Sequence, residues 1–108
     1  MADLNVNDIA RELAATAAAG DAGRASHTLY GGHDKALRQT LIVLQAGHEL
    51  AAHESPGEAT LLVLAGDVRV SAEAGSWEGS TGDLIPVPPS RHSVAALSDA
   101  AILLTVVK

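Results

Sequence analysis

Residues 47–66 read GHELAAHESPGEATLLVLAG, with two runs that favour extended backbone on either side of the turn-forming sequence Ser55-Pro56-Gly57. Proline fixes the backbone and glycine frees it where a chain reverses, so the stretch predicts a hairpin of strands 49–55 and 58–64. The second run contains TLLVL, which is apolar at consecutive positions. Such a strand is typical of a sheet that is covered on both faces.

Outside this hairpin, residues 24–108 repeat the same rhythm of short apolar runs, separated by Gly, Pro and Asp at intervals of about ten residues. Seven further strands are predicted, near 26–30, 37–46, 67–72, 76–81, 83–87, 92–97 and 100–107. Nine antiparallel strands predict a closed barrel or sandwich, because an open sheet of that size would leave exposed edges.

The first residues have a helical period instead. Apolar residues recur every four positions, at Ile9, Leu13 and Ala17, after Asn7 as a suitable N-cap and before Gly20 as a suitable end. This pattern predicts one amphipathic helix.

The chain therefore divides into an N-terminal helix with its linker, residues 1–23, and a barrel, residues 24–108. Strands that are apolar on both faces need cover on the outside of the barrel. We expect the helix either to cap the barrel or to join an interface, and we expect the chain to form a homodimer.

Composition excludes several classes of function. The chain has 108 residues, enough for one core, and 13 acidic against 7 basic residues give a formal net charge of -6. That balance, without a basic patch, argues against a nucleic-acid partner. The absence of cysteine excludes disulfides, thiolate metal sites and cysteine nucleophiles, and fits a cytoplasmic protein. A signal peptide and a run of about 20 apolar residues are both missing, so no membrane partner is expected.

Residues 47–66 resemble the first motif of the cupin superfamily, in which a glycine precedes His-x-His, a glutamate and a second glycine. Gly47, His53 and Gly66 fall on that spacing, whereas Ser55 stands at the second histidine and Ala59 at the glutamate. The resemblance implies an all-β cupin barrel, a jelly roll, here with one N-terminal helix.

Residues 82–92, GDLIPVPPSRH, resemble the second cupin motif, with His92 at its histidine. The segment is one residue short, and Ser90 replaces a glycine. In metal-binding cupins the resemblance implies three imidazoles and one carboxylate around a divalent transition metal.

This chain keeps two of those four ligands, His53 and His92, which we expect to face each other across the barrel. Iron, zinc, nickel or manganese would need further donors, because sites with two protein ligands are weak. Glu49 is in phase with His53 and could serve, whereas Glu58 would need a β-bulge to turn inward. The sequence therefore assigns no cofactor, and a bound metal stays open.

Strand alternation predicts a mostly apolar ligand site inside the barrel. Its expected lining residues are His53, Ser55, Ala59, Leu61, Val63 and His92. We expect His27, His33 and His48 to be surface or turn residues. Arg38 interrupts an apolar strand, and either points to solvent or binds an anion.

Two functional hypotheses follow. The first is a binding module that holds a small, mostly apolar molecule, with His53 and His92 as polar lining. The second is a metal-dependent enzyme that resembles cupin dioxygenases or isomerases, with the same two histidines as ligands. A hydrolase triad has no support, because no Gly-x-Ser-x-Gly sequence occurs. Whether the protein is an enzyme stays open.

Overall fold

The computed structural model describes residues 4–54 and 57–108. It begins with helix α1 (Val6–Ala19). In the described part of the chain, the strands that follow are β1 (Arg24–Tyr30), β2 (Leu37–Leu44), β3 (Glu49–His53), β4 (Glu58–Ala65), β5 (Asp67–Ala72), β6 (Gly75–Ser80), β7 (Leu84–Pro86), β8 (His92–Ala96) and β9 (Ala100–Val107).

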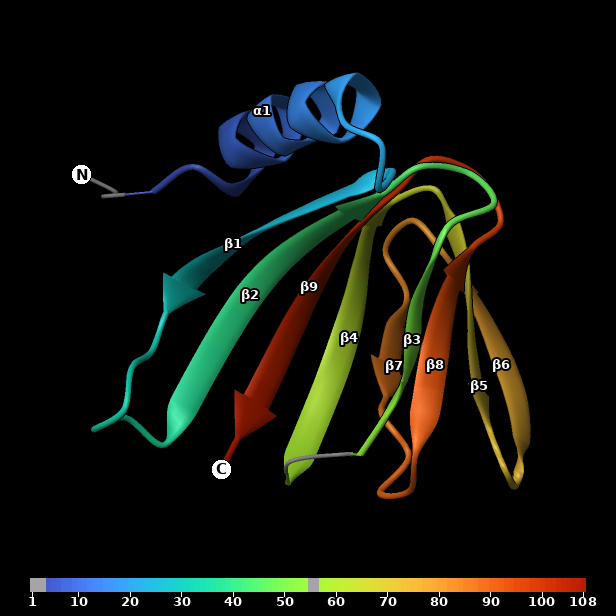
Figure 1. The fold of residues 1–108 in the computed structure, drawn as a ribbon. Helices are drawn as coiled ribbons and strands as arrows, with labels where there is room; N and C mark the ends of the chain where they lie inside the picture. The colour runs from blue at the N-terminus through green and yellow to red at the C-terminus, as the bar shows by residue number, and fades with distance from the viewer. Residues whose placement is uncertain (1–3, 55–56) are drawn as a thin grey trace.

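The strands form two antiparallel sheets that face each other (Figure 1). The five-stranded sheet has the order β1-β2-β9-β4-β7, and the four-stranded sheet has the order β3-β8-β5-β6. Several neighbours in each sheet are far apart in sequence, as β2 and β9 are in one and β3 and β8 in the other, which is typical of a jelly roll. The predicted all-β fold with a single N-terminal helix is confirmed.

The main core fills the space between the two sheets. Alternate residues of each central strand point inward and are buried, as the period of two requires. The buried members of this cluster are Ile42, Leu44, Leu61, Val63, Val68, Val70, Ile85, Val94, Ala96, Ala100 and Ile102.

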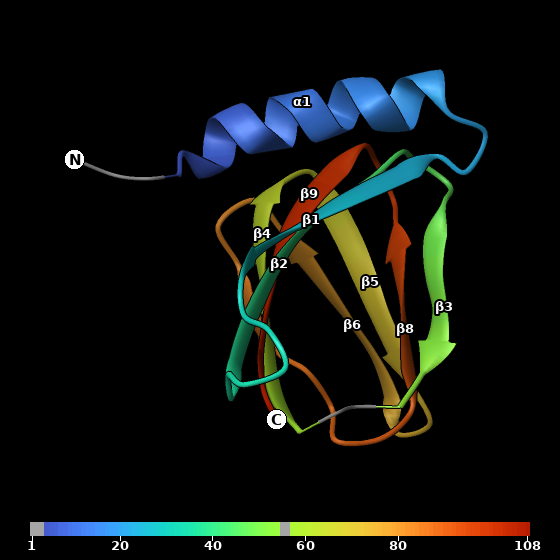
Figure 2. The same cartoon turned by 60° about the vertical axis from the view of Figure 1, so that its left-hand side comes forward.

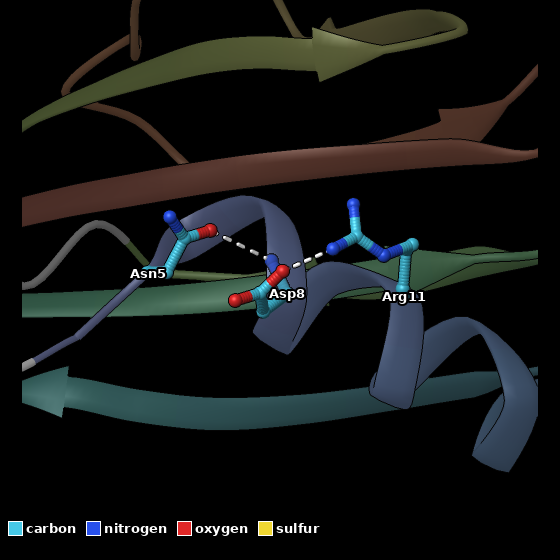
Figure 3. Close-up of polar contacts among 3 residues, drawn as sticks. All are labelled: Asn5, Asp8 and Arg11. Carbon is cyan, nitrogen blue, oxygen red and sulfur yellow. Dashed lines mark hydrogen bonds and ion pairs between the residues drawn. The ribbon is translucent and has the colours of Figure 1, made fainter.

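Helix α1 starts at Val6 with Asn5 as its N-cap, two residues before the predicted cap, so the prediction of Asn7 is wrong. The Asn5 side chain accepts a hydrogen bond from the backbone N–H of Asp8 at 3.0 Å, which satisfies a free donor of the first turn (Figure 3). Asp8 also pairs with Arg11 on the exposed side of the helix. The helix ends as expected at Gly20, whose N–H bonds to the carbonyl of Thr16.

Helix α1 packs against β1 and β2, on outward-facing side chains of the five-stranded sheet, and Figure 2 shows it lying across one end of the barrel. Ala17 lies in a second apolar cluster with Val43 and Ala101, which point outward from β2 and β9. The helix thus covers the outward side chains of strands that are apolar on both faces.

Part of that outer face stays exposed. Leu37 and Val107, paired on β2 and β9, are 39% and 44% exposed, and Leu84 on β7 is 60% exposed. Homodimer formation, which would cover such a face, stays a prediction. Within residues 4–54 and 57–108, no helix is long and apolar enough to cross a membrane.

The barrel has two unlike ends. We call the end nearer α1 the helix end; it carries the connections at 45–48, 81–83 and 97–99 (Figure 1). We call the opposite end the histidine end, because β3 finishes there at His53 and β8 starts there at His92.

Candidate functional site

His53 and His92 are direct neighbours in the four-stranded sheet. They are opposite residues of the antiparallel pair β3–β8, and their ring centroids lie 4.5 Å apart with an interplanar angle of 61°. The prediction that they face each other across the barrel is wrong. Alternation identifies the face on which a side chain lies, but the pairing of β3 with β8 decides its neighbour.

An irregularity in β3 places His53 beside His92. Leu50 pairs with Val94 and His53 pairs with His92, so three residues of β3 advance against two of β8. This β-bulge lets Leu50 and His53 share the inner face although they are an odd number of residues apart. Glu49 pairs with Ala95 and is exposed, so its predicted inward position is wrong.

Each imidazole is held by a carbonyl two residues earlier in the chain. His53 Nδ1 lies 3.0 Å from the carbonyl oxygen of Ala51, and His92 Nδ1 lies 2.9 Å from that of Ser90. A carbonyl oxygen only accepts, so Nδ1 carries the proton and donates in both rings. In the neutral form, each Nε2 then keeps its lone pair for a ligand.

The two rings differ in exposure. His92 is 4% exposed and lies beside the main core, whereas His53 is exposed at the rim. One imidazole is thus fixed by packing, and the other is reachable from solvent.

The nearby carboxylates do not complete a metal site. Glu58 pairs with Val107, which is on the outer face, and the Glu54 carboxylate lies 3.7 Å from the Arg91 guanidinium. Among the residues that the structure describes, no three His, Asp or Glu side chains come together as a metal-binding group. Two imidazoles alone do not fit a resident transition metal, which needs three or four protein ligands.

The other predicted lining residues divide between core and rim. Leu61 and Val63 point into the barrel, but they are 1% and 0% exposed and packed in the core. Ala59 is half-buried and lines an open pocket of about 570 Å³, together with Val87 and Pro89 among others. Ser55 lies outside the described residues. The open space that the structure offers near these residues is therefore at the histidine end, not in mid-barrel.

The sequence left the orientation of Arg38 open and did not single out the other members of a polar stripe on the inner face of β1 and β2. Arg38 and Thr40 alternate with Ile42 and therefore face the interior, and Thr28 pairs with Thr40. Further along the stripe, a cavity of about 290 Å³ is lined by Arg24, Ala25, Ser26, Thr40, Ile42 and Leu50. The alternation of residues in β2 places Arg38, Thr40 and Ile42 on one face. Because the strand is apolar on both faces, the sequence does not reveal which face is the inner one.

The remaining histidines lie away from this site. His27 pairs with Leu41 on the outer face of β1 and is exposed. His33 is exposed after β1, and His48 is half-buried in the turn before β3.

No protein-family model matches the chain, and the comparison with curated proteins finds no match either. Solved structures do match. A protein of unknown function from Streptococcus pyogenes is 28% identical, with a TM-score of 0.73 over 82% of this chain and 77% of that one. A cupin-2 domain containing protein from Shewanella frigidimarina is 14% identical, with a TM-score of 0.69 over 98% and 95%. The chain has the cupin fold.

A salicylate 1,2-dioxygenase from Pseudaminobacter salicylatoxidans is also similar to this cupin barrel, with 18% identity and a TM-score of 0.77. The match covers 92% of this chain and 33% of that enzyme. The cupin resemblance of the sequence is thereby confirmed at the level of the fold.

Proposed function

We propose that this cupin barrel binds a small, mostly apolar molecule at its histidine end, with His53 and His92 as the polar contacts. The observation that carries the proposal is the imidazole pair itself. The rings lie 4.5 Å apart, and each Nδ1 is already engaged with a backbone carbonyl. Neither Nε2 is used in these bonds, and the exposed ring of His53 is the one that a ligand can reach from solvent.

The surroundings favour an apolar body for that ligand. The open pocket at this end is lined by Ala59, Pro86, Val87 and Pro89, together with Gly57, Glu58 and Thr60. Pro89 adjoins Ser90, whose carbonyl holds the His92 ring. A pocket with much apolar lining and a few fixed polar atoms is the usual form of a small-molecule site.

A second function, that of a metal-dependent enzyme, has one observation in its favour. Metal-ligating histidines commonly donate their second N–H to a carbonyl or carboxylate, as Nδ1 does in both rings here. A salicylate 1,2-dioxygenase shares the fold. The two-imidazole donor set makes this the second choice.

The test combines a binding measurement with an assay of metal content. Hexanamide, a neutral amphiphile, would be titrated into untagged ¹⁵N-labelled protein purified without chelators, and amide shifts would be followed by NMR. We expect saturable shifts at the histidine end, with a dissociation constant on the order of millimolar for so small a probe. His53→Ala should weaken the binding.

His27→Ala is the matched control, because His27 lies on the outer face of the five-stranded sheet. Absence of saturable shifts at the histidine end, with hexanamide and with hexanoate alike, would overturn the binding proposal. Elemental mass spectrometry of the same samples addresses the second function. Near one transition metal per chain, lost in His53→Ala and kept in His27→Ala, would replace the first proposal with the second.

A further inference from the structure

The charges on the inner faces of this barrel have one sign, although the chain as a whole is acidic. The formal net charge is -6. In the described strands, every carboxylate is at an outer-face position, because each one pairs with an outer-face residue or is adjacent in its strand to an inner-face residue. These carboxylates are Glu49, Glu58, Asp67 and Glu78. Arg24 and Arg38, by contrast, are at inner-face positions, because they alternate with the core residues Ile42 and Leu44 or pair with them.

The arginines differ in their partners as well. Arg11, Arg69 and Arg91, which point to solvent, each pair with a carboxylate. Within residues 4–54 and 57–108, the guanidinium groups of Arg24 and Arg38 have no ion pair and no side-chain hydrogen bond. Arg38 is also half-buried. A partly desolvated guanidinium without a counter-charge favours an anion beside it.

The strand register places Arg38 at the histidine end. Arg38 pairs with Val106 on β9, and Val106 pairs in turn with Ala59 on β4. These three residues form one row across the five-stranded sheet, in which Arg38 and Ala59 are two strands, or about 10 Å, apart. Ala59 lines the pocket at that end, so the row runs from Arg38 to the proposed ligand site.

Residues with hydroxyl groups occupy inner-face positions close to that of Arg38. Thr40 is the next inner residue of β2 after Arg38, and Thr28 is directly opposite Thr40 on β1. A single guanidinium with neighbouring hydroxyl donors matches one carboxylate in charge and in hydrogen-bond geometry. A phosphate, with a charge nearer two, would be left partly uncompensated by one arginine.

We propose that the molecule bound at the histidine end is a small amphiphilic carboxylate, whose carboxylate binds the guanidinium of Arg38 and whose apolar body lies in the pocket beside Ala59. This inference rests on the proposed function and specifies its ligand class. His53 and His92 then contact the body or a second polar group of the same molecule.

The test compares hexanoate with hexanamide, which have the same shape and differ in charge. Both are titrated into the wild type, Arg38→Gln and Arg69→Gln at low ionic strength, because screening weakens such contacts. Arg69→Gln is the matched control: it removes the same charge from an outward arginine, 3.6 Å from Glu78. We expect the wild type and Arg69→Gln to bind hexanoate about tenfold tighter than hexanamide, and Arg38→Gln to lose this preference.

Two further variants keep the outcome interpretable. Arg38→Lys keeps the positive charge but lacks the planar guanidinium, so it should retain part of the preference for hexanoate. This result would separate the loss of charge in Arg38→Gln from a folding defect in that variant. Ala59→Glu supplies a fixed carboxylate in the same row, and should reduce hexanoate binding more than hexanamide binding.

The failures are distinguishable. Equal affinity for both probes in the wild type would overturn the carboxylate inference and leave the proposed function standing. A preference that survives in Arg38→Gln and disappears in Arg24→Gln would overturn the assignment to Arg38. If neither probe binds, the proposed function fails, and this inference fails with it.

Discussion

The two ends of the barrel use polar residues differently. At the helix end, side chains join one connection to another: Asp99 accepts a hydrogen bond from the N–H of Ala46 at 2.8 Å, and Ser98 accepts one from the N–H of Asp67 at 3.0 Å. The Ser80 hydroxyl donates to the Asp67 carboxylate at 2.7 Å. These bonds connect three separate loops. Because the polar groups bond to one another, they are not left for a ligand.

Around the two histidines at the opposite end, the side-chain polar contacts are local or loose. His53 and His92 each bond to a carbonyl two residues away, which orients the ring without tying two loops together. The Arg91–Glu54 pair, at 3.7 Å, is exposed on both sides. The comparison indicates that the helix end closes the barrel, whereas the histidine end keeps polar atoms available for a ligand.

The largest effect expected from this difference is at Gly66, in the tight connection at the helix end. Its φ of +84° is in the left-handed region, and an added Cβ would lie 2.2 Å from the carbonyl oxygen of Asp99. We expect Gly66→Ala to lower the free energy of unfolding by at least about 3 kcal/mol, from backbone strain plus the steric clash. Urea unfolding followed by circular dichroism measures it.

Gly47→Ala is the control, because Gly47 has a φ of +83° but no atom within 4 Å of the added Cβ. It should cost about 1–2 kcal/mol, the price of the left-handed conformation alone. Equal losses in the two variants would contradict a tightly packed helix end.

A somewhat smaller effect comes from the same truncation at two valines. Val63 is 0% exposed between the sheets, and Val87 is half-buried at the pocket of the histidine end. Val63→Ala removes two buried methyl groups and leaves a cavity, so we expect a loss of about 2–3 kcal/mol. Val87→Ala should cost less than about 1 kcal/mol, because the site already opens to solvent. A loss in the free energy of unfolding that is larger for Val87→Ala than for Val63→Ala would contradict the difference between a packed interior and an open rim.

The sequence predicts this fold well because turn-forming residues are closely spaced along the chain. Glycine, proline and aspartate mark nearly every turn, and β5 and β9 have the predicted bounds 67–72 and 100–107. Such local chemistry determines where strands begin and end. The cupin resemblance adds the jelly-roll architecture.

The candidate site is less predictable, because it depends on pairing and register. The bulge between Leu50 and His53 falls on two alanines that carry no turn signal. Without the bulge, Glu49 would share the face of His53, which is why it was a candidate donor. Arg38 was ambiguous for a related reason: the run TLIVL after it is apolar on both faces, and packing against β9 and the core selects the inner one.

The smallest effects concern single polar contacts at the two ends. Asp99→Ala removes the acceptor for the N–H of Ala46 at the helix end, and Glu54→Ala removes the partner of Arg91 at the histidine end. A hydrogen bond to a carboxylate at a loop junction contributes about 1–2 kcal/mol, whereas an exposed ion pair contributes about 0–0.5 kcal/mol. We expect the midpoint of urea unfolding to fall clearly for Asp99→Ala and to stay near the wild type for Glu54→Ala.

Hydrogen exchange of the same two variants localises the effect. Asp99→Ala should speed exchange at Ala46 and in the adjoining connection, because local opening follows loss of the bond. Glu54→Ala should leave exchange in β3 and β8 unchanged, since the backbone ladder between these strands does not depend on the ion pair. A stability loss in Glu54→Ala as large as that in Asp99→Ala would show that the histidine end is also held by its loop contacts. In that case, polar groups unused in structural contacts would no longer distinguish the histidine end as the binding end.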